Sequence, residues 1–359
     1  MIAELEESLA ATPYSLEPEA RQRLMLEGLN ALTAKHYERC LPYRRIIDGY
    51  WRGKTEFEEI GGAPYLPVSI FKTQIMQSVP DTEVRLTLTS SGTTGQAVSR
   101  IPLDAETSSI QQRALASSLR HVLGPDRLPM LVIDTDKVFK DPKMMSARGA
   151  GVLGLMRYGR THSFALDASL EPDIKGIRQF LDQLEGRPFF MFGFTFLVWT
   201  SFYERLRDKG LDLSAGVLIH SGGWKKMAER AVSNAFFRTA FGDAFGLTKI
   251  HNFYGLVEQI GSIFLEGRGG LLYAPNFADV IVRDPRTLEP VPDGSTGLVQ
   301  LLSLLPHSYP GHSILTEDLG VIERISDGAD GWAGKGLRIE GRLPRSDLRG
   351  CSDVIAMAA

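Results

Sequence analysis

Cysteine is almost absent from the chain, which has only Cys40 and Cys351 among its 359 residues. Two thiols so far apart exclude a disulfide framework and a cysteine-rich zinc site, and they are typical of a reducing compartment. An excess of one charge is lacking as well, because 43 acidic residues face 40 basic ones and the net charge is −3. A chain without a basic field has no general attraction for nucleic acid, so we expect no nucleic-acid partner.

Long apolar runs are also missing. The most apolar segment is PFFMFGFTFLVWTSFY, residues 188–203. It is shorter than the roughly 20 apolar residues that a bilayer-spanning helix requires, so it indicates buried core or the wall of an apolar pocket. The amino terminus, MIAELEESLAATPYSLEPEARQRL, is acidic and polar, which is unlike a signal peptide. We expect a cytoplasmic protein with no membrane span.

The residue pattern predicts an α/β fold. Helices are expected over residues 19–37, 105–122, 174–184, 197–209 and 225–241, and strands over 128–134, 189–192, 216–221 and 249–255. After Gly267 short apolar runs are separated by Pro, Gly and Asp, which is typical of antiparallel strands with tight turns. We therefore expect a helical lead-in over 1–85, an α/β portion over 86–265 and a β-rich portion over 266–340.

One small-residue loop has the composition of a phosphate-binding site. Residues 87–96 read TLTSSGTTGQ, in which hydroxyl groups alternate with glycines that allow tight turns. Such a loop can bind a polyphosphate through its backbone amides and hydroxyls, although an ordinary turn between a strand and a helix has the same composition. No lysine follows the last glycine, so it is not a Walker loop. The candidate phosphate ligands are Thr89, Ser90, Ser91, Gly92, Thr93, Thr94 and Gly95.

The loop resembles the phosphate-binding signature of the adenylate-forming superfamily, which includes acyl- and aryl-CoA synthetases, peptide-synthetase adenylation domains and firefly luciferase. Later signatures of that superfamily follow in order. Residues 221–223, SGG, resemble its adenine-side loop, and residues 253–258, FYGLVE, resemble its Tyr-Gly-x-Thr-Glu segment with Val257 in place of Thr. Residues 316–318 resemble its Thr-Gly-Asp segment with Glu317 in place of Gly, and Gly341-Arg342 followed by Asp347 resembles its hinge.

Within the superfamily, the chain resembles the acyl-protein synthetase family of bacterial luminescence, the fatty-acid–luciferin-component ligases. The segments that carry this resemblance are HSGGWK at 220–225, SARG at 146–149, FGF at 192–194 and LRGCS at 348–352. The resemblance implies the large N-terminal domain of the adenylate-forming fold over residues 1–340. It also implies that the C-terminal domain is missing or reduced to a hinge-like stub over 341–359.

The resemblance implies that ATP, with Mg²⁺, activates a fatty or aromatic carboxylic acid as an acyl-adenylate, that pyrophosphate is released, and that the acyl group then passes to a thiol. Glu258 is then the Mg²⁺ ligand, with a surface carboxylate as the alternative. The adenine and ribose side is assigned to Ser221, Gly222, Gly223, Tyr254, Gly255, Asp318 and Arg342. A plain core aromatic is the alternative for Tyr254.

Positive charge at the reacting centre needs another source, because the superfamily's adenylation lysine lies in the C-terminal domain. Lys225 and His220 flank the Gly-Gly turn and are our candidates, and Arg148 is a weaker one. The alternatives are a solvated lysine at a helix start for Lys225 and a hydrogen-bonded core histidine for His220.

Cys351 is the candidate acyl carrier. In the resembled family, a cysteine near the carboxyl terminus takes the acyl group from the adenylate as a thioester. Cys351 follows Arg345, Arg349 and Gly350, a basic setting that favours the thiolate, although an inert tail thiol is the alternative. The final acceptor is a thiol on a carrier protein, a reductase-type partner or coenzyme A.

Four aromatic residues and one leucine supply a candidate acyl pocket, whose predicted wall is Phe192, Phe194, Trp199, Phe253 and Leu256. Such a lining suits a fatty or an aryl acid, and ordinary core packing is the alternative.

Three other functions compete with acyl transfer to a protein. The first is an acyl- or aryl-CoA ligase that uses free coenzyme A, and the second is a non-catalytic adenylate- or acyl-binding component. The third is an NAD(P)-dependent oxidoreductase, because residues 149–154, GAGVLG, fit the dinucleotide-binding pattern. That pattern requires a strand directly before its first glycine, and the strand expected at 128–134 ends too early.

Overall fold

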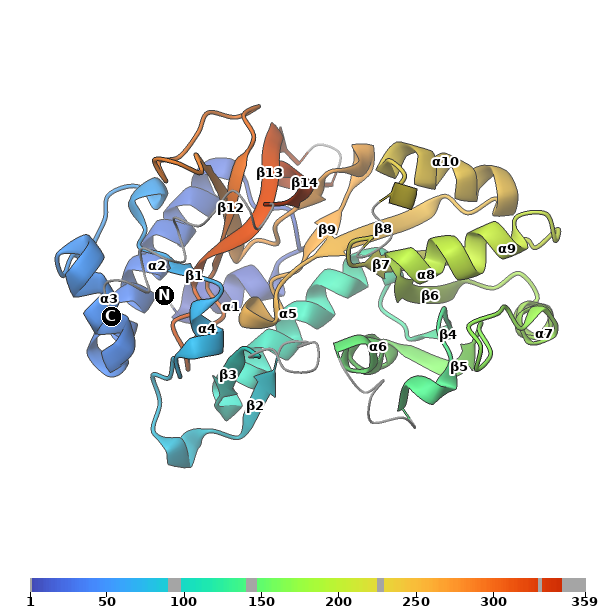
Figure 1. Ribbon diagram of the computed structural model, residues 1–359, viewed down its shortest axis with the longest axis horizontal. Coiled ribbons are helices and arrows are strands. Elements are labelled where there is room, and N and C mark those ends of the chain that lie inside the picture. The colour runs from blue at the N-terminus through green and yellow to red at the C-terminus, as the bar shows by residue number, and fades with distance from the viewer. Residues whose placement is uncertain (1, 90–97, 140–146, 225–228, 329–330, 344–359) are drawn as a thin grey trace.

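The computed structural model of the chain describes residues 2–89, 98–139, 147–224, 229–328 and 331–343. Figure 1 shows an elongated molecule with two halves. The N-terminal helices and the last strands share one half, and the alternating helices and strands from the middle of the chain form the other. The predicted phosphate residues 90–95, Lys225 and Cys351 lie outside the described residues.

Helices and strands alternate in the middle of the chain, as the residue pattern predicts. The helices are α1 (Ile2–Ala10), α2 (Pro18–Arg39), α3 (Leu41–Trp51), α4 (Ile70–Thr73), α5 (Ala105–Leu123), α6 (Ala147–Met156), α7 (Ile174–Leu184), α8 (Thr195–Leu197), α9 (Glu204–Leu206) and α10 (Asn234–Phe245). The strands are β1 (Leu66–Pro67), β2 (Leu86–Thr89), β3 (Arg100–Leu103), β4 (Leu128–Val132), β5 (Gly159–Phe164), β6 (Phe189–Phe194), β7 (Gly216–Ser221), β8 (Lys249–Tyr254), β9 (Phe264–Glu266), β10 (Leu272–Tyr273), β11 (Ala278–Arg283), β12 (Gly297–Ser303), β13 (Ser313–Asp327) and β14 (Ala333–Arg342).

One twelve-stranded sheet organises both halves. Its strand order is β11-β12-β13-β14-β10-β9-β8-β7-β6-β4-β5, and β1 pairs with β13. Neighbouring strands from β5 to β8 are parallel, whereas β8 and β9 are antiparallel, so the strand direction changes at β8. In open α/β sheets, ligands bind beyond the carboxyl ends of the parallel strands. The ends of β6, β7 and β8 are therefore where a site is expected.

Helices cover both faces of the parallel strands, which explains why those strands are apolar along their whole length. Alternate side chains enter two separate cores. Met191 and Leu218 pack with α7 and α10 on one face, and Phe192 and Ile219 lie in the core on the other face, to which α5 and α6 contribute. Successive residues of β6, β7 and β8 therefore point to opposite faces of the sheet and enter different cores.

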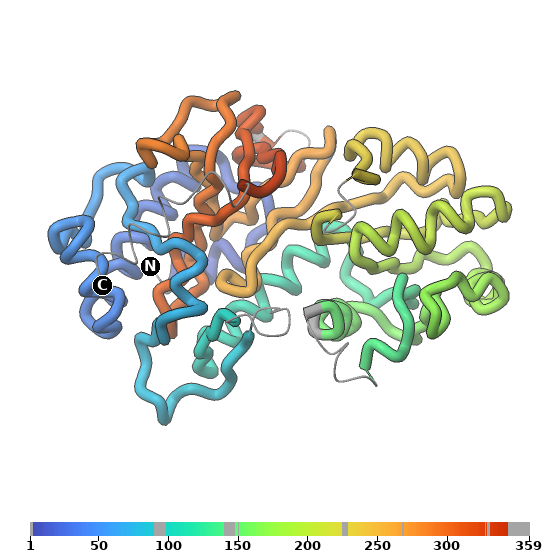
Figure 2. Tube along the Cα trace, viewed as in Figure 1, coloured from blue at the N-terminus to red at the C-terminus, as the bar shows by residue number. Residues whose placement is uncertain are grey.

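The first helices are attached to the last strands. The buried Arg21 of α2 donates to the carbonyl oxygens of Ala274, Pro275, Ala278 and Ala333. Figure 2 shows the blue N-terminal tube running beside the orange and red C-terminal strands. The ends of the described chain therefore form one packed unit.

A separate hairpin carries the segment that contains the predicted phosphate loop. β2 and β3 are antiparallel, and Thr89 at the end of β2 is the register partner of Arg100 at the start of β3. The loop therefore connects two strands rather than a strand and a helix. Thr89 itself is exposed.

The structure confirms the predicted α/β class and corrects two helices. The helix expected over 225–241 begins at Asn234, because the Ser233 hydroxyl oxygen accepts the amide of Phe236 and caps it, and it continues to Phe245. The helix expected over 197–209 is divided into α8, a π-helical turn over Val198–Tyr203 and α9. The GAGVLG glycines lie inside α6, well after β4 ends, which confirms that the segment is not a dinucleotide loop.

Candidate active site

Three residues assigned to the adenosine side come together where β8 and β14 end beside β13. The hydroxyl of Tyr254 donates to Oδ2 of Asp318 at 2.7 Å, and Nε of Arg342 lies 3.9 Å from Oδ1 of the same carboxylate. Asp318 and Arg342 are register partners on β13 and β14. Burial, and then the neighbouring Asp318 charge, raise the pKa of Tyr254 well above its ordinary value, so its hydroxyl remains a donor at neutral pH.

Glu317, which replaces the glycine of the Thr-Gly-Asp segment, gives Arg342 a second partner. Nη2 of Arg342 donates to Oε2 of Glu317 at 2.7 Å. Both side chains are largely exposed, at 63% and 47%, so the pair contributes little to stability. The substitution therefore places a second carboxylate beside the guanidinium without displacing Asp318.

The Ser-Gly-Gly loop follows β7 and is tied to β8. The Ser221 hydroxyl donates to the carbonyl oxygen of Phe253 at 3.0 Å. Gly222 has φ of +86°, a conformation that favours glycine, and a Cβ there would lie 3.3 Å from the ring of Phe194. Gly223 is exposed, and Gly255 packs beside Ile263 on the following turn.

Glu258 is buried in a short 3-10 turn after β8, which excludes the surface-carboxylate alternative. Its side chain is 4% exposed, and its backbone carbonyl accepts the hydroxyl of Tyr309 at 2.9 Å. Burial raises the pKa of the Glu258 carboxyl, while a hydrogen bond from Ser99 and the nearby charge of Lys72 lower it. Ser99 lies just after residues 90–97, so Glu258 is placed close to the carboxyl end of the predicted phosphate loop.

This environment fits a hard divalent cation. A carboxylate oxygen is the ligand type that Mg²⁺ prefers, and Mg²⁺ keeps several waters and takes further oxygens from phosphates, so one protein carboxylate is sufficient. Among the described residues, no three His, Cys, Asp or Glu side chains converge as a metal cage.

His220 is a buried and neutral histidine. It is 3% exposed, its Nδ1 hydrogen-bonds the hydroxyl of Thr195 at 2.9 Å, and its ring stacks on Phe237 of α10. Burial, followed by the charges of His251 and Arg238, lowers the pKa of His220 to about 3. The ring therefore carries no positive charge near pH 7, which corrects the cationic role that the sequence assigned to it. Its Nε2 has no hydrogen-bond partner among the described residues.

Arg148, the weaker basic candidate, is engaged by a carboxylate. Its Nε donates to Oδ2 of Asp134 at 2.7 Å and its Nη2 donates to Oδ1, while the Asp134 side chain is 1% exposed. Asp134 follows β4 and also accepts the amide of Thr135 at 2.6 Å. The guanidinium thus joins α6 to the end of β4, and its charge is already balanced.

The five predicted wall residues of the acyl pocket do not share one core. Phe192, Phe194 and Phe253 lie in the core that faces α5 and α6. Trp199 lies on the opposite face, where it stacks on Tyr203 at 4.4 Å. Leu256 packs against two further cores formed with the N-terminal helices. The three phenylalanines remain together as a wall, and the structure does not bring the other two residues to it.

Gly151 of α6 touches this wall. A Cβ at Gly151 would lie 3.0 Å from Cζ of Phe194, whose ring also faces Gly222. The Phe194 ring therefore lies between α6 and the Ser-Gly-Gly loop.

Several residues of the site region were not identified from the sequence. Asn252 precedes Phe253 on β8 and is the register partner of His220, and its Oδ1 has no hydrogen-bond partner among the described residues. Asp134 and Ser99 are polar residues whose role depends on partners distant in the chain. A polar residue directly after an apolar strand was the available signal for Asp134, whereas Asn252 lies inside β8 among other polar residues.

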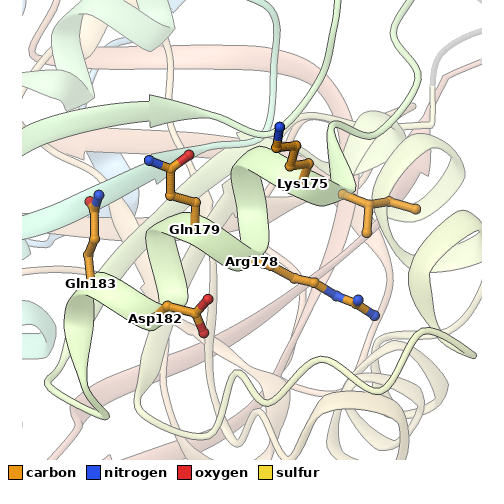
Figure 3. A pocket seen from close by; sticks show the side chains of 6 residues that line it. Lys175, Arg178, Gln179, Asp182 and Gln183 are labelled. Atoms are coloured by element: carbon orange, nitrogen blue, oxygen red, sulfur yellow. The ribbon is translucent and has the colours of Figure 1, made fainter.

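A surface depression along α7 lies apart from these residues. Figure 3 shows side chains of α7 projecting beside it, and it is lined by Ile174, Lys175, Arg178, Gln179, Asp182 and Gln183. None of these is a predicted site residue, so the depression does not belong to the candidate site. No helix in the described part of the chain combines the length and apolarity that a membrane crossing requires.

Comparisons with known proteins agree with this architecture. The structure is similar to the crystal structure of an open conformation of 2-hydroxyisobutyryl-CoA ligase in complex with 2-HIB-AMP and CoA, with a TM-score of 0.66 and 17% identity over 92% of this chain and 76% of that one. This likeness shows the adenylate-forming fold.

Two curated relatives share most of their length with the chain. The long-chain-fatty-acid–luciferin-component ligase of Aliivibrio fischeri is 24% identical over 94% of this chain and 88% of its own. The enzyme of the same name from Vibrio harveyi is 23% identical over 95% and 89%. The family model described as "Acyl-protein synthetase, LuxE" matches residues 2–359. The chain therefore belongs to the LuxE acyl-protein synthetase family and is a ligase with the adenylate-forming fold.

Proposed function

We propose that this ligase activates a fatty or aromatic carboxylic acid with ATP and passes the acyl group to a thiol through an acyl-Cys351 intermediate. The observation that supports it best is the convergence of Tyr254, Asp318 and Arg342 at the end of β8, with buried Glu258 on the next turn. Together these residues offer an aromatic ring, a hydrogen-bond acceptor, a cation and a hard oxygen ligand. These groups suit the base, the ribose, the phosphates and the metal ion of a bound nucleoside triphosphate.

In the first half-reaction, a carboxylate oxygen of the acid forms a bond to the α-phosphorus of ATP, and the bond from that phosphorus to the β-phosphate oxygen breaks. Pyrophosphate leaves, and acyl-AMP remains. Asp318 accepts hydrogen bonds from the ribose hydroxyls, and Arg342 donates hydrogen bonds to the ribose or a phosphate. The ring of Tyr254 lies against the base. Glu258 would hold Mg²⁺, and the charge that this ion would supply is one that neutralises phosphate. Lys225 offsets the charge on the acid and the α-phosphate, since His220 is neutral.

In the second half-reaction, a thiolate attacks the acyl carbon, and the bond between that carbon and the AMP oxygen breaks. Cys351 forms this thioester first, and a thiol of a carrier protein or a reductase-type partner then takes the acyl group. Phe192, Phe194 and Phe253 form an apolar wall that suits a fatty chain or an aryl ring. The names of the curated relatives, which are long-chain-fatty-acid ligases, favour the fatty acid.

The experiment is acid-dependent ATP–pyrophosphate exchange over fatty acids of graded length and aryl acids, followed by intact mass of the enzyme. We expect exchange with at least one acid class and one added acyl group per chain. The Cys351→Ala variant should retain exchange and lose the acyl adduct. Cys40→Ala is the matched control, because the Cys40 thiol is buried at 1% exposure and should not be acylated.

Three results would contradict the proposal in different ways. ATP binding without exchange for any acid would indicate a non-catalytic adenylate-binding component. Exchange with rapid turnover on free coenzyme A and no enzyme adduct would indicate a CoA ligase. An adduct that persists in Cys351→Ala would place the acyl group on another residue.

A further inference from the structure

A buried ion pair lies beside the candidate site but contains none of its residues. Glu266 ends β9 and is 0% exposed, and Nη1 of Arg238 on α10 donates to its Oε1 at 2.7 Å. Nδ2 of Asn234, also on α10, donates to Oε2 at 3.1 Å. Burial raises the pKa of Glu266, and the Arg238 charge is the largest influence that lowers it. A buried carboxylate needs such partners, because an unpaired charge in the core is costly.

This pair holds three consecutive residues of β8. Nη1 of Arg238 also donates to the carbonyl of Ile250 at 2.6 Å. The backbone amide of Asn252 donates to Oε2 of Glu266 at 2.8 Å, and Nδ1 of His251 hydrogen-bonds the backbone carbonyl of Glu266 at 2.8 Å. The Glu266 carboxylate therefore accepts a hydrogen bond from the Asn252 amide of β8, which a carbonyl of a neighbouring strand would otherwise accept.

The residues that follow these three are those proposed to meet the substrates. Phe253 and Tyr254 pair with Leu265 and Phe264 of β9, directly before Glu266. Farther along, the Ser221 hydroxyl holds the carbonyl of Phe253, and the Tyr254 hydroxyl binds Asp318. Glu266 and Arg238 thus anchor β8 from its β9 edge and from α10, just before the strand reaches the site.

This anchoring matters because β8 is the strand at which the sheet changes direction. Its one neighbour is parallel and its other is antiparallel, and β9 is only three residues long. The hydrogen bonds from the Glu266 and Arg238 side chains to β8 add to the few backbone hydrogen bonds that the short β9 can form with it. A displacement of about 1 Å at a reacting centre can cost roughly 100-fold in rate, so the placement of this strand is consequential.

We propose that Glu266 is a positioning residue for nucleotide binding. With Arg238 and Asn234 it holds the β8 backbone in the position in which Tyr254 contacts the adenosine and Phe253 contacts the acid. The inference rests on the proposed function, because it assigns a purpose to the placement of those two residues. Glu266 itself touches neither substrate. Its side chain contacts α10 and the backbone of β8.

The test compares Glu266→Gln and Arg238→Lys with the wild-type chain. Glu266→Gln keeps the size of the side chain and one acceptor oxygen but loses the charge that pairs with Arg238. Arg238→Lys keeps the charge but replaces the planar guanidinium that reaches both Glu266 and the Ile250 carbonyl. We expect the Kd for ATP, measured by calorimetry, to rise at least fivefold in Glu266→Gln and by a smaller factor in Arg238→Lys. The KM for ATP in pyrophosphate exchange should rise in parallel.

The matched control is Asp279→Asn, which breaks another partly buried pair. Nζ of Lys335 lies 3.0 Å from Oδ2 of Asp279, and their side chains are 27% and 6% exposed, close to the 32% and 0% of Arg238 and Glu266. This control should lose thermal stability as Glu266→Gln does, with no change in the Kd for ATP. A purely structural role for Glu266 would give the two variants the same pattern.

The outcomes separate this inference from the proposed function. A folded Glu266→Gln or Arg238→Lys variant with the wild-type Kd for ATP overturns the positioning role, and Arg238→Lys alone decides the question if Glu266→Gln does not fold. A wild-type chain that neither binds ATP nor exchanges pyrophosphate rejects the proposed function instead, and the positioning role with it.

Discussion

The Tyr254→Phe substitution deletes a single oxygen atom and with it the hydrogen bond between Tyr254 and Asp318. The bond is 2.7 Å long, its acceptor is a carboxylate, and the Asp318 side chain is only 23% exposed. Hydrogen bonds to charged groups contribute about 1.5–3 kcal/mol. Because water can reach part of Asp318, we expect the free energy of unfolding to fall by about 1.5–2 kcal/mol, at the lower end of that range.

The same variant should weaken nucleotide binding. In the proposed function, Asp318 binds the ribose and the Tyr254 ring lies against the base. Tyr254→Phe removes the hydrogen bond that orients the Asp318 carboxylate and leaves the ring unchanged. We expect the Kd for ATP to rise roughly tenfold, which corresponds to about 1.4 kcal/mol. Urea unfolding followed by fluorescence, and calorimetric titration with ATP, measure the two effects separately.

Tyr37→Phe is the matched control. Its hydroxyl donates to Oδ1 of Asp48 at the same 2.7 Å, but this pair is exposed to solvent. We expect a change within about 0.5 kcal/mol in unfolding and none in ATP binding. Equal effects of the two substitutions on unfolding and on the Kd for ATP would refute the reasoning, because burial and position would then not matter.

Two further predictions concern buried charges. Burial raises the pKa of the Glu258 carboxyl and the charge of Lys72 lowers it, and the proposed function requires the ionised carboxylate as the Mg²⁺ ligand. In a pH–rate profile, exchange activity should therefore be lost on the acid side at a higher pH than the pKa of an ordinary glutamate. Lys72→Met should move this acid limb of the profile to still higher pH, and an acid limb that does not move would contradict the assignment of Glu258 as the Mg²⁺ ligand. Asp134→Ala leaves the Arg148 guanidinium, whose side chain is 17% exposed, without its carboxylate. It should lower the free energy of unfolding by about 3 kcal/mol, and a urea midpoint close to that of the wild type would show that the pair is not a buried structural contact.

Strand positions were predictable where the local pattern and the packing agree. β7 lies at the predicted residues 216–221, because an apolar run that ends at Ser-Gly-Gly has one plausible structure. The start of α10 was misplaced, because residues 225–232 have helical composition while the cap is at Ser233. The π-helical turn over Val198–Tyr203 has the same apolar pattern as an α-helix, so periodicity cannot distinguish them.

The candidate site divides in the same way. The sequence predicts that Tyr254, Asp318 and Arg342 serve one site because each lies in a segment that resembles a known signature, and the structure brings these three side chains together. The neutral state of His220 could not, because its pKa depends on burial under Phe237 of α10. Glu266 and Arg238 carry no sequence signal, since they are ordinary charged residues whose pairing arises only when α10 packs on the sheet.

The attachment of the first helices to the last strands has a consequence for how the chain folds. β1 pairs with β13 through Leu66 and Ile314, and Arg21 binds carbonyls as far along the chain as Ala333. These contacts join segments separated by most of the sequence, and such long-range pairing is slow to form because the intervening loop must close first. During synthesis, α2 and α3 emerge long before their partners, with apolar faces that include Leu29 and Ile47. The N-terminal helices can therefore complete their packing only after the last strands have been made.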